Sequence, residues 1–291
     1  MPSDSFDGLV SLRQPKTRNE RRVKRIIVRI LKQLKMYRTA RRIWYRCELI
    51  QPWSEPRRRK RAMLPFYSQF IKEGDLCFDV GANIGERTEV FVKLGGTVVA
   101  VEPQDVCIKR LRKKYGNNGR VKIVKKALGD KEGQAEMMLS NAHKISSLSK
   151  GWIDSVKASG RLSDYRWDSR VIVPVTTLDR LIEEYGQPVF CKIDVEGFEF
   201  EVLKGLSKPI KAISLEFNPE FLDPAINSIK RLSSMGMLWF NYSVGESMRL
   251  GLAKWVKAEE LCNILTTLPD KTIAGDIYVT SAPRFTRFTS R

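Results

Sequence analysis

The chain has 291 residues, of which 52 are Lys or Arg and 33 are Asp or Glu, so its formal net charge is +19 at pH 7. This length is sufficient for one large α/β domain with an appendage. A transmembrane helix, a secretory signal and a zinc or disulfide site are disfavoured, because the sequence has no run of 18 apolar residues, no apolar core near its start and five cysteines without metal-like spacing. We therefore expect a cytoplasmic protein.

The positive charge is concentrated near the start of the chain. Residues 1–62 hold 19 Lys and Arg against 5 Asp and Glu, whereas the other 229 residues carry a net charge of only +5. We divide the chain into a basic, largely helical extension over residues 1–62, a main domain over residues 63–282 and a basic tail over residues 283–291. Residues 1–18 and the tail are expected to be disordered.

Within the extension, apolar residues recur at helical spacing between Arg and Lys, which predicts one or two amphipathic helices over residues 19–48. Residues 57–61 are consecutive basic residues flanked by prolines, and we predict a linker there. Residues 19–61 leave three interpretations open. Their helices dock on the main domain, or they contact an anionic membrane or another acidic polymer at the periphery, or they bind nucleic acid, which is the least favoured of the three.

The most informative stretch is a buried strand over residues 76–80, followed by a turn with Gly81 and Gly85 and then by a helix. Glycine lets the backbone adopt positive φ and approach a ligand. Ligands of open α/β sheets bind beyond the carboxyl ends of the strands, which is where Asp79 lies. The turn, with Asn83 between its glycines, lacks the third glycine of the dinucleotide fingerprint, and Asp79 would repel a phosphate. The sequence therefore favours a cationic, amine-bearing cofactor over a dinucleotide, with a merely structural turn as the other alternative.

A second strand, over residues 97–101, ends in an acid. Its continuous apolar run is typical of a strand buried on both faces, and Glu102 and Pro103 follow it. An acid at this position can accept hydrogen bonds from a ribose diol. Because a dehydrogenase would carry the same acid, Glu102 indicates a ribose without identifying the cofactor. The alternative is a surface glutamate before a turn proline.

The third strand, over residues 121–124, leads to a turn with two interpretations. In the first, Ala127 and Leu128 pack on the face of an adenine and Asp130 accepts a hydrogen bond from its amino group. In the second, the same segment is a hairpin turn that leads into a strand over residues 134–139.

Residues 140–170 form a long polar connection, and connections of this kind over the carboxyl edge of a parallel sheet are often substrate lids. The connection contains two tryptophans and His143, the sole histidine of the chain, whose ordinary pKa near 6.5 suits a general base. The alternative for His143 is a surface residue without a role. Arg161, Arg166 and Arg170 would suit an acidic ligand.

A further buried strand, over residues 189–193, ends in Asp194 and Glu196, and Gly197 and a helix follow. Acids at a helix N-terminus are stabilised by the macrodipole, which explains Glu199 well but not Asp194, because Asp194 is still within the strand. We therefore expect Asp194 and Glu196 to face the ligand. Two carboxylates this close either raise one pKa or bind a divalent ion. The pair suggests a metal site, but because no third ligand is evident in the sequence, we assign no metal.

The remaining part of the chain completes an α/β pattern. It predicts a strand over residues 212–217, a helix over residues 224–234 and a closing pair of strands over residues 238–242 and 273–280.

Six short motifs stand in a fixed order: Phe78-Asp79-Val80-Gly81-Ala82-Asn83-Ile84-Gly85, Val101-Glu102-Pro103, Ala127-Leu128-Gly129-Asp130, Ser146-Ser147-Leu148, Val175-Thr176-Thr177-Leu178-Asp179 and Lys192-Ile193-Asp194-Val195-Glu196-Gly197. In their order and spacing, across residues 64–282, the chain resembles an FkbM-type methyltransferase, a branch of the class I S-adenosylmethionine-dependent enzymes. The resemblance implies a three-layer, Rossmann-like α/β fold whose sheet of about seven strands is mostly parallel with a reversed last strand. It also implies methyl transfer from S-adenosylmethionine, usually to a hydroxyl of a sugar or of a secondary metabolite.

The same resemblance implies a set of cofactor contacts. The residues expected to contact the cofactor are Asp79, Gly81, Ala82, Asn83, Gly85, Thr88, Glu102, Pro103, Ala127, Leu128, Asp130 and Asp194. The loop that begins at Asp79 would bind the methionine part, Glu102 the ribose, and the turn around Asp130 the adenine.

The resemblance places Asp194 and Glu196 at the site of methyl transfer. An alcohol is a weak nucleophile, so a general base within hydrogen-bond reach is expected. We predict that Glu196 is this base or orients the acceptor, with His143 as the alternative base.

Three rival functions remain open. A nucleic-acid methyltransferase would suit the basic charge, but the (Asn/Asp/Ser)-Pro-Pro-aromatic signature of base-amino methylation does not follow the fourth strand. A non-catalytic scaffold with a cofactor fold is disfavoured by the intact loop, Glu102 and the acidic pair. A dehydrogenase is disfavoured by the missing third glycine and by Asn83.

Overall fold

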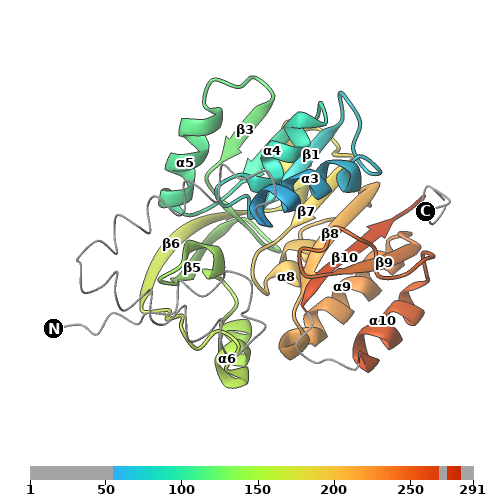
Figure 1. Cartoon of the computed structure of the whole chain (residues 1–291). Helices are drawn as coiled ribbons and strands as arrows, with labels where there is room; N and C mark the ends of the chain where they lie inside the picture. Colours follow the sequence, from blue (N-terminus) through green and yellow to red (C-terminus); the bar gives the residue numbers. More distant parts are fainter. Residues whose placement is uncertain (1–54, 269–273, 283–291) are drawn as a thin grey trace, which may run out of the picture. The chain divides into compact units, whose positions relative to one another are not determined.

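The computed structural model describes residues 55–268 and 274–282 (Figure 1). The amphipathic helices predicted over residues 19–48 and the tails predicted over residues 1–18 and 283–291 lie outside the described residues. In the described part, no helix is both long and apolar enough to cross a membrane.

Helix α3 (Glu55–Tyr67) is the first described element, so residues 57–61, where we predicted a linker, are helical. The physical reason is the apolar sequence that follows the basic run. Met63, Phe66 and Tyr67 are buried at helical spacing and belong to an apolar cluster shared with the central sheet. The helix therefore extends through the basic residues that precede this anchored segment.

Seven strands form the central sheet in the order β3, β2, β1, β7, β8, β10 and β9. Their bounds are β1 (Leu76–Val80), β2 (Thr97–Val101), β3 (Val121–Val124), β7 (Phe190–Ile193), β8 (Ala212–Phe217), β9 (Trp239–Val244) and β10 (Gly275–Thr280). Strand β10 is antiparallel to both of its neighbours, whereas β3, β2, β1, β7 and β8 are mutually parallel. The predicted seven-stranded sheet with a reversed last strand is confirmed.

The strand order shows at which edge of the sheet a ligand is expected to bind. The chain moves outward from β1 through β2 to β3 and then crosses back to β7, on the other side of β1. In open α/β sheets, ligands bind beyond the carboxyl ends of the strands at this reversal. The backbone N–H of Asp194 donates to the carbonyl of Val80 at 3.0 Å, so the ends of β7 and β1 meet there.

Helices cover both faces of the sheet (Figure 1). One face of the sheet shares an apolar cluster with four helices, α7 (Leu178–Tyr185), α8 (Glu199–Lys204), α9 (Leu222–Ser234) and α10 (Ala258–Thr267). The other face shares its apolar clusters with α3, α4 (Glu86–Lys93) and α5 (Asp105–Tyr115). Phe78 and Val80 pack with the first group, and Cys77 packs with the second, as the alternation of a strand requires. The three-layer α/β fold is thus confirmed.

The face covered by α3 and α4 changes from apolar to polar towards the carboxyl ends of the parallel strands. Alternation from Cys77 and Phe190 places Asp79 and Lys192 on this face, and both are buried. Asp276 of β10 is buried on the same face and pairs in register with Glu216 of β8. The polar residues of the site therefore stand on one face of the sheet.

A second sheet has the order β4, β6, β5, with β4 (Ala127–Leu128), β5 (Gly133–Leu139) and β6 (Ser169–Thr176). Strand β6 is parallel to β4 and antiparallel to β5. The strand predicted over residues 134–139 is confirmed, but the hairpin prediction is wrong, because β6 lies between the two strands that flank the turn.

The connection predicted over residues 140–170 is folded. It contains the 3₁₀ turn η2 (His143–Ile145), helix α6 (Lys150–Ser159) and the start of β6. Trp152 and Trp167 are both buried, with ring centroids 6.1 Å apart, in an apolar cluster separate from the main core. The two tryptophans therefore give this segment a small core of its own.

Four of the five cysteines lie in the described residues, and all four are free thiols. Cys77 and Cys191 fill space in β1 and β7, as predicted, and Cys107 is buried in α5. Cys47 lies outside the described residues.

Candidate active site

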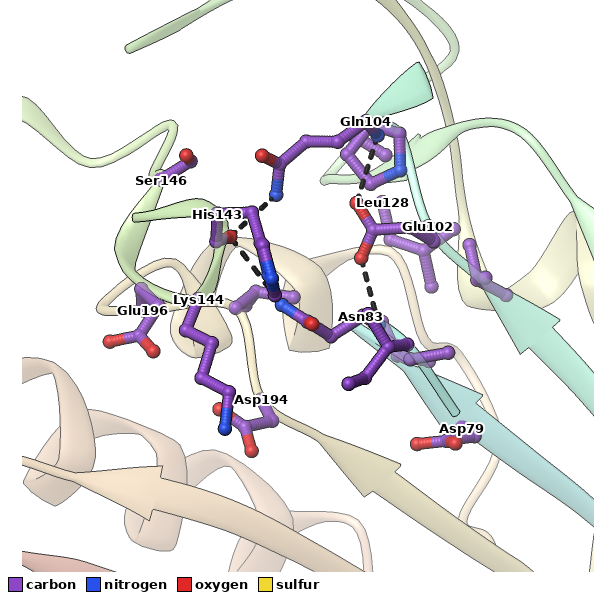
Figure 2. Close-up of a pocket in the computed structure, with 18 of the residues that line it drawn as sticks. Asp79, Asn83, Glu102, Gln104, Leu128, His143, Lys144, Ser146, Asp194 and Glu196 are labelled. Atoms are coloured by element: carbon purple, nitrogen blue, oxygen red, sulfur yellow. Dashed lines mark hydrogen bonds between the residues drawn. The ribbon is translucent and has the colours of Figure 1, made fainter. Parts of the chain in front are cut away.

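A cavity of about 230 Å³ lies beyond the carboxyl ends of β1, β2, β7 and β8 (Figure 2). Most of the residues predicted from the sequence line it, namely Asp79, Gly81, Ala82, Asn83, Glu102, Pro103, Ala127, Leu128, His143, Asp194 and Glu196. Three predicted residues, Gly85, Thr88 and Asp130, do not line it. The fold therefore brings five separate segments of the sequence to one place.

The loop between β1 and α4 depends on left-handed backbone, with φ of 79° at Gly81, 51° at Asn83 and 79° at Gly85. A Cβ on Gly81 would lie 1.8 Å from the carbonyl oxygen of Asp194, so glycine is required where the ends of β1 and β7 meet. Gly85 supports packing, since the hydroxyl of Tyr115 donates to its carbonyl at 3.1 Å and a Cβ there would lie 2.8 Å from the Tyr115 ring.

Thr88 acts from behind the cavity wall. Its hydroxyl donates a hydrogen bond to the carboxylate of Asp79, which is only 2% exposed. Burial raises the pKa of Asp79, and the hydrogen bond from Thr88 opposes this shift. Thr88 therefore orients Asp79 without touching the cavity.

Both carboxylate oxygens of Glu102 are fixed by backbone donors. The N–H of Asn83 donates to Oε2 at 2.9 Å, and the N–H of Gln104 donates to Oε1 at 2.8 Å (Figure 2). Burial raises the pKa of Glu102 to about 7, and the two backbone hydrogen bonds oppose this shift. Glu102 is therefore held in one orientation at the position where a ribose diol was predicted.

His143 is anchored through its backbone. Its carbonyl accepts hydrogen bonds from Nε2 of Gln104 at 2.9 Å and from Nδ2 of Asn83 at 3.4 Å (Figure 2). Its ring Nε2 lies 3.1 Å from Nη1 of Arg110, and its Nδ1 is buried without a partner among the described residues. Burial lowers the pKa of His143, and the charge of Arg110 lowers it further. Gln104 was missed, although it directly follows the predicted Glu102-Pro103 pair.

The turn after β7 has a strained backbone and is held in place by contacts from the segment that contains Ser147 and α6. Glu196 is a non-glycine residue with a φ of 55°, and its carbonyl accepts a hydrogen bond of 2.6 Å from the hydroxyl of Ser147. A Cβ on Gly197 would lie 2.3 Å from the Trp152 side chain, so α6 packs directly on this turn. The segment that contains Ser147 and α6 thereby fixes the position of Glu196.

Three carboxylates, from Asp194, Glu196 and Glu216, converge at the ends of β7 and β8, each offering an oxygen within 4.8 Å of the others. Burial raises the pKa of Glu196 and of Glu216 well above the ordinary value, and the neighbouring acids raise it further. Oε2 of Glu216 is buried without a partner among the described residues. Within the described part, this is the group that could bind a metal ion. Glu216 was missed, although an acid near the end of a buried strand was a signal.

Residues 79–236, more than half of the chain, match the family model described as the methyltransferase FkbM domain. The chain belongs to the FkbM methyltransferase family. Solved structures of similar fold include the methyltransferase FkbM from Methylobacillus flagellatus, at 16% identity and a TM-score of 0.44, with 75% of this chain and 47% of that chain covered. The chain thus spans about half the length of that protein. A precorrin-6Y C5,15-methyltransferase from Geobacter metallireducens is 10% identical, with a TM-score of 0.41 and coverage of 76% of this chain and 87% of that chain. No curated protein sequence matches the chain.

Two cations of this FkbM-family site were not predicted. The side chain of Lys192 is 1% exposed, and its Nζ lies 2.9 Å from Asp276 and 3.2 Å from Asp194. A lysine inside an otherwise apolar strand was the signal, because a buried charge requires partners. Arg87, in the first turn of α4, forms an ion pair of 2.5 Å with Glu246, and both residues line the cavity.

Glu199 and Asp130 lie apart from the cavity lining. Glu199 accepts hydrogen bonds from the N–H groups of Val195 and Gly197 at 3.0 and 3.2 Å, in agreement with its interpretation as an acid at a helix N-terminus. Asp130 is exposed, so its predicted contact with an adenine receives no support from its position, whereas Ala127 does line the cavity.

The three arginines predicted to suit an acidic ligand do not line the cavity. Each pairs with an acid: Arg161 with Glu220 at 2.6 Å, Arg166 with Asp168 at 3.5 Å, and Arg170 with Glu136 at 3.0 Å. Their position therefore gives no support to an acidic acceptor.

Proposed function

We propose that this FkbM-family protein transfers a methyl group from S-adenosylmethionine to a hydroxyl group of a sugar, a glycan or a secondary metabolite. The observation that carries the proposal is the carboxylate of Glu102, which backbone N–H groups fix at both oxygens in the cavity that also contains the acids after β7. Membership of the family supports methyl transfer.

The lining residues fit this cofactor in charge and polarity. Glu102 can accept hydrogen bonds from a ribose diol, and Ala127 and Leu128 offer an apolar surface to an adenine. Asp79 and Asp194 favour the cationic part of the molecule, whereas they would repel the phosphates of a dinucleotide.

When bound, S-adenosylmethionine supplies an activated methyl group, so the protein has to align the acceptor hydroxyl and remove its proton. Glu196 suits this second task, because its raised pKa makes its carboxylate a stronger base than that of an exposed glutamate. The clamp from Ser147 fixes the backbone of Glu196. His143 is the alternative base, since it lines the same cavity.

The experiment is transfer of a labelled methyl group from S-adenosylmethionine to a panel of sugars, oligosaccharides and hydroxylated metabolites. We expect transfer to at least one hydroxyl compound, and a lower kcat/KM by roughly tenfold or more in Glu102→Ala, since hydrogen bonds to charged groups are among the stronger ones. Glu136→Ala is the matched control, because Glu136 is outside the cavity lining and pairs with Arg170. Labelling of nucleic acid or of amines, with no hydroxyl compound labelled, would contradict the proposal.

A peripheral contact of the basic residues 19–61 with an anionic membrane or an acidic polymer is a separate proposal. Its support is the charge of the extension, since residues 1–62 hold 19 of the 52 Lys and Arg. Salt-dependent co-sedimentation of the full chain with phosphatidylserine vesicles would support it, and equal sedimentation with neutral vesicles would contradict it.

A further inference from the structure

Arg87 is the buried cation of the described cavity lining. It is the second residue of α4, in the first turn after the loop that follows β1, and it is only 9% exposed. The other basic side chains of the described lining are those of Lys126, His143 and Lys144, and none of these residues is buried. An arginine removed from water in a ligand cavity requires acceptors for its N–H groups.

The guanidinium of Arg87 is only partly satisfied. Its Nη2 donates to Oε2 of Glu246 at 2.5 Å, and its Nη1 faces Sδ of Met63 at 3.4 Å, which is a weak acceptor. Its Nε is buried and has no partner among the described residues. The Nε and Nη2 donors form the fork that matches a carboxylate with two parallel hydrogen bonds, and Glu246 engages one of the two.

The carboxylate of Glu246 is more accessible than the cation that it contacts. The Glu246 side chain is 47% exposed, whereas the Arg87 side chain is 10% exposed. Glu246 follows β9 and lines the same cavity. Glu246 engages one of the two donors of this fork and remains half-exposed, so a ligand carboxylate that engages both Nε and Nη2 can replace it.

The surroundings of Arg87 indicate which carboxylate this is. Asp79 and Asp194 line the same cavity, and the charge of Arg87 is close enough to lower the pKa of Asp79. An α-amino acid group carries an ammonium and a carboxylate on one carbon, so it requires charges of both signs side by side. The two aspartates match the ammonium, and Arg87 matches the carboxylate.

We propose that Arg87 binds the α-carboxylate of the methionine part of S-adenosylmethionine, and that Glu246, which accepts from Nη2 of Arg87, occupies part of this position in the structure. The proposal rests on the proposed function and adds a specific contact to it. It predicts that the affinity gained from the carboxylate depends on Arg87.

The test is a calorimetric comparison of two ligands on three proteins. The ligands are S-adenosylhomocysteine and its decarboxylated analogue, which keeps the adenosine, the thioether and the ammonium. The proteins are the wild type, Arg87→Met and Arg87→Lys. Arg180→Met is the matched control, because Arg180 is an exposed arginine of α7 that pairs with Glu132 and Glu183 outside the cavity lining.

We expect the wild type and Arg180→Met to bind S-adenosylhomocysteine roughly tenfold to a hundredfold more tightly than the analogue, as a two-point charge-assisted contact predicts. Arg87→Met should bind the two ligands with affinities within about threefold, and Arg87→Lys should show an intermediate preference, since lysine keeps the charge and loses the fork. An unchanged preference in the Arg87 variants would overturn the inference, and so would an equal loss of affinity for both ligands.

Two further outcomes separate this inference from the proposed function. If the wild type binds neither ligand, the proposed cofactor site fails and the inference fails with it. If the wild type binds both ligands and the preference survives in the variants, only the role of Arg87 fails. Should Arg87→Met not fold, as judged by thermal unfolding, Arg87→Lys decides the question in the same way.

Discussion

The carboxylates at the ends of β2 and β7 line the same cavity, but they differ in their hydrogen-bond partners and in the surroundings that shift their pKa values. At the end of β2, Glu102 accepts a backbone N–H at each oxygen, and burial raises its pKa to about 7. Beyond β7 and β8, burial and mutual repulsion raise the pKa of Glu196 and of Glu216 well above the ordinary value, and Oε2 of Glu216 has no partner among the described residues.

The hydrogen-bond donors that Glu102 needs are already in place in the structure. The acids at the ends of β7 and β8 repel one another, and none of them has such a pair of backbone donors within the described part of the chain. The donors to Glu102 are main-chain N–H groups of the two turns that the fold fixes, so this carboxylate is ready for a neutral polar ligand. Lys192 is a buried cation next to the acids at the ends of β7 and β8, and its charge is shared between Asp194 and Asp276. A proton or a cationic ligand would stabilise these acids, in line with the methyl-donor site that we propose.

The largest effect is expected from Glu196→Gln, which removes the proposed base and keeps the shape of the side chain. The kcat for methyl transfer should fall by roughly 10²–10⁴-fold, the usual contribution of a general base. Steady-state kinetics with an acceptor from the hydroxyl panel measures this. The control is Glu201→Gln, which changes a glutamate of α8 outside the cavity lining that pairs with Lys204. If Glu196→Gln and His143→Ala both keep full kcat, the assignment of the base is wrong.

The next effect is on stability. In Lys192→Met, Asp194 and Asp276 lose their shared buried partner, and the free energy of unfolding should fall by about 3–5 kcal/mol, as when one partner of a buried ion pair is removed. Urea unfolding at neutral pH measures the loss. Lys204→Met is the control, because Lys204 is exposed.

A second substitution sharpens this stability test. Adding Asp276→Asn to Lys192→Met should restore part of the stability, since one uncompensated carboxylate is then removed. A free energy of unfolding within experimental error of the wild type for Lys192→Met would contradict the role of Lys192.

A smaller effect is expected from pH. The raised pKa values mean that Glu196 and Glu216 retain protons to a higher pH than ordinary glutamates, and a bound cation must release them. The affinity for S-adenosylmethionine should therefore rise with pH until these groups are ionised, by up to about tenfold per pH unit for each proton released. S-adenosylhomocysteine lacks the sulfonium charge and should show a shallower rise. Calorimetry at several pH values around neutral measures the affinity of each ligand. If the two affinities changed equally with pH, the proposed difference between Glu102 and the acids at the ends of β7 and β8 would be contradicted.

The smallest effect concerns the support of the loop after β1. Tyr115→Phe removes the hydrogen bond to the carbonyl of Gly85 and should lower the free energy of unfolding by about 1 kcal/mol. Thermal unfolding measures this, with Tyr165→Phe as the control because Tyr165 is 38% exposed. A loss of the same size in both variants would show that the bond to Gly85 has no special role.

The central sheet could be predicted because its strands carry their own signals. The strands predicted over residues 76–80, 97–101, 121–124 and 212–217 have the observed bounds of β1, β2, β3 and β8, since each is a short apolar run that ends in a polar turn. The predicted loop and Glu102 were found because they follow such strands directly. Strand positions and the residues directly after them could therefore be predicted, because both depend on neighbouring residues in the sequence.

The second sheet could not be predicted, because its pairing is not local. Strand β6 is mostly exposed and contains Pro174, so it has no alternating apolar pattern, and it pairs with β4 and β5 although both lie far from it in sequence. The hairpin prediction failed for this reason.

The missed members of the site were also decided by distant neighbours. Glu216 belongs with Asp194 because β8 pairs with β7, and Lys192 has its partner in β10. Arg87 is defined by its contacts with Glu246 and Met63, which are far from it in sequence. The sequence shows that such residues are charged, but their partners are known only once the strands are aligned.

The most direct test of the account is calorimetric binding of S-adenosylmethionine and S-adenosylhomocysteine to the wild type, to Glu102→Ala and to the control Glu136→Ala. The account predicts saturable binding of both ligands to the wild type and to Glu136→Ala, and an affinity lower by roughly tenfold or more in Glu102→Ala. The absence of binding to the folded wild type, or equal affinity in Glu102→Ala, would contradict the claim that this cavity is a methyl-donor site built around Glu102.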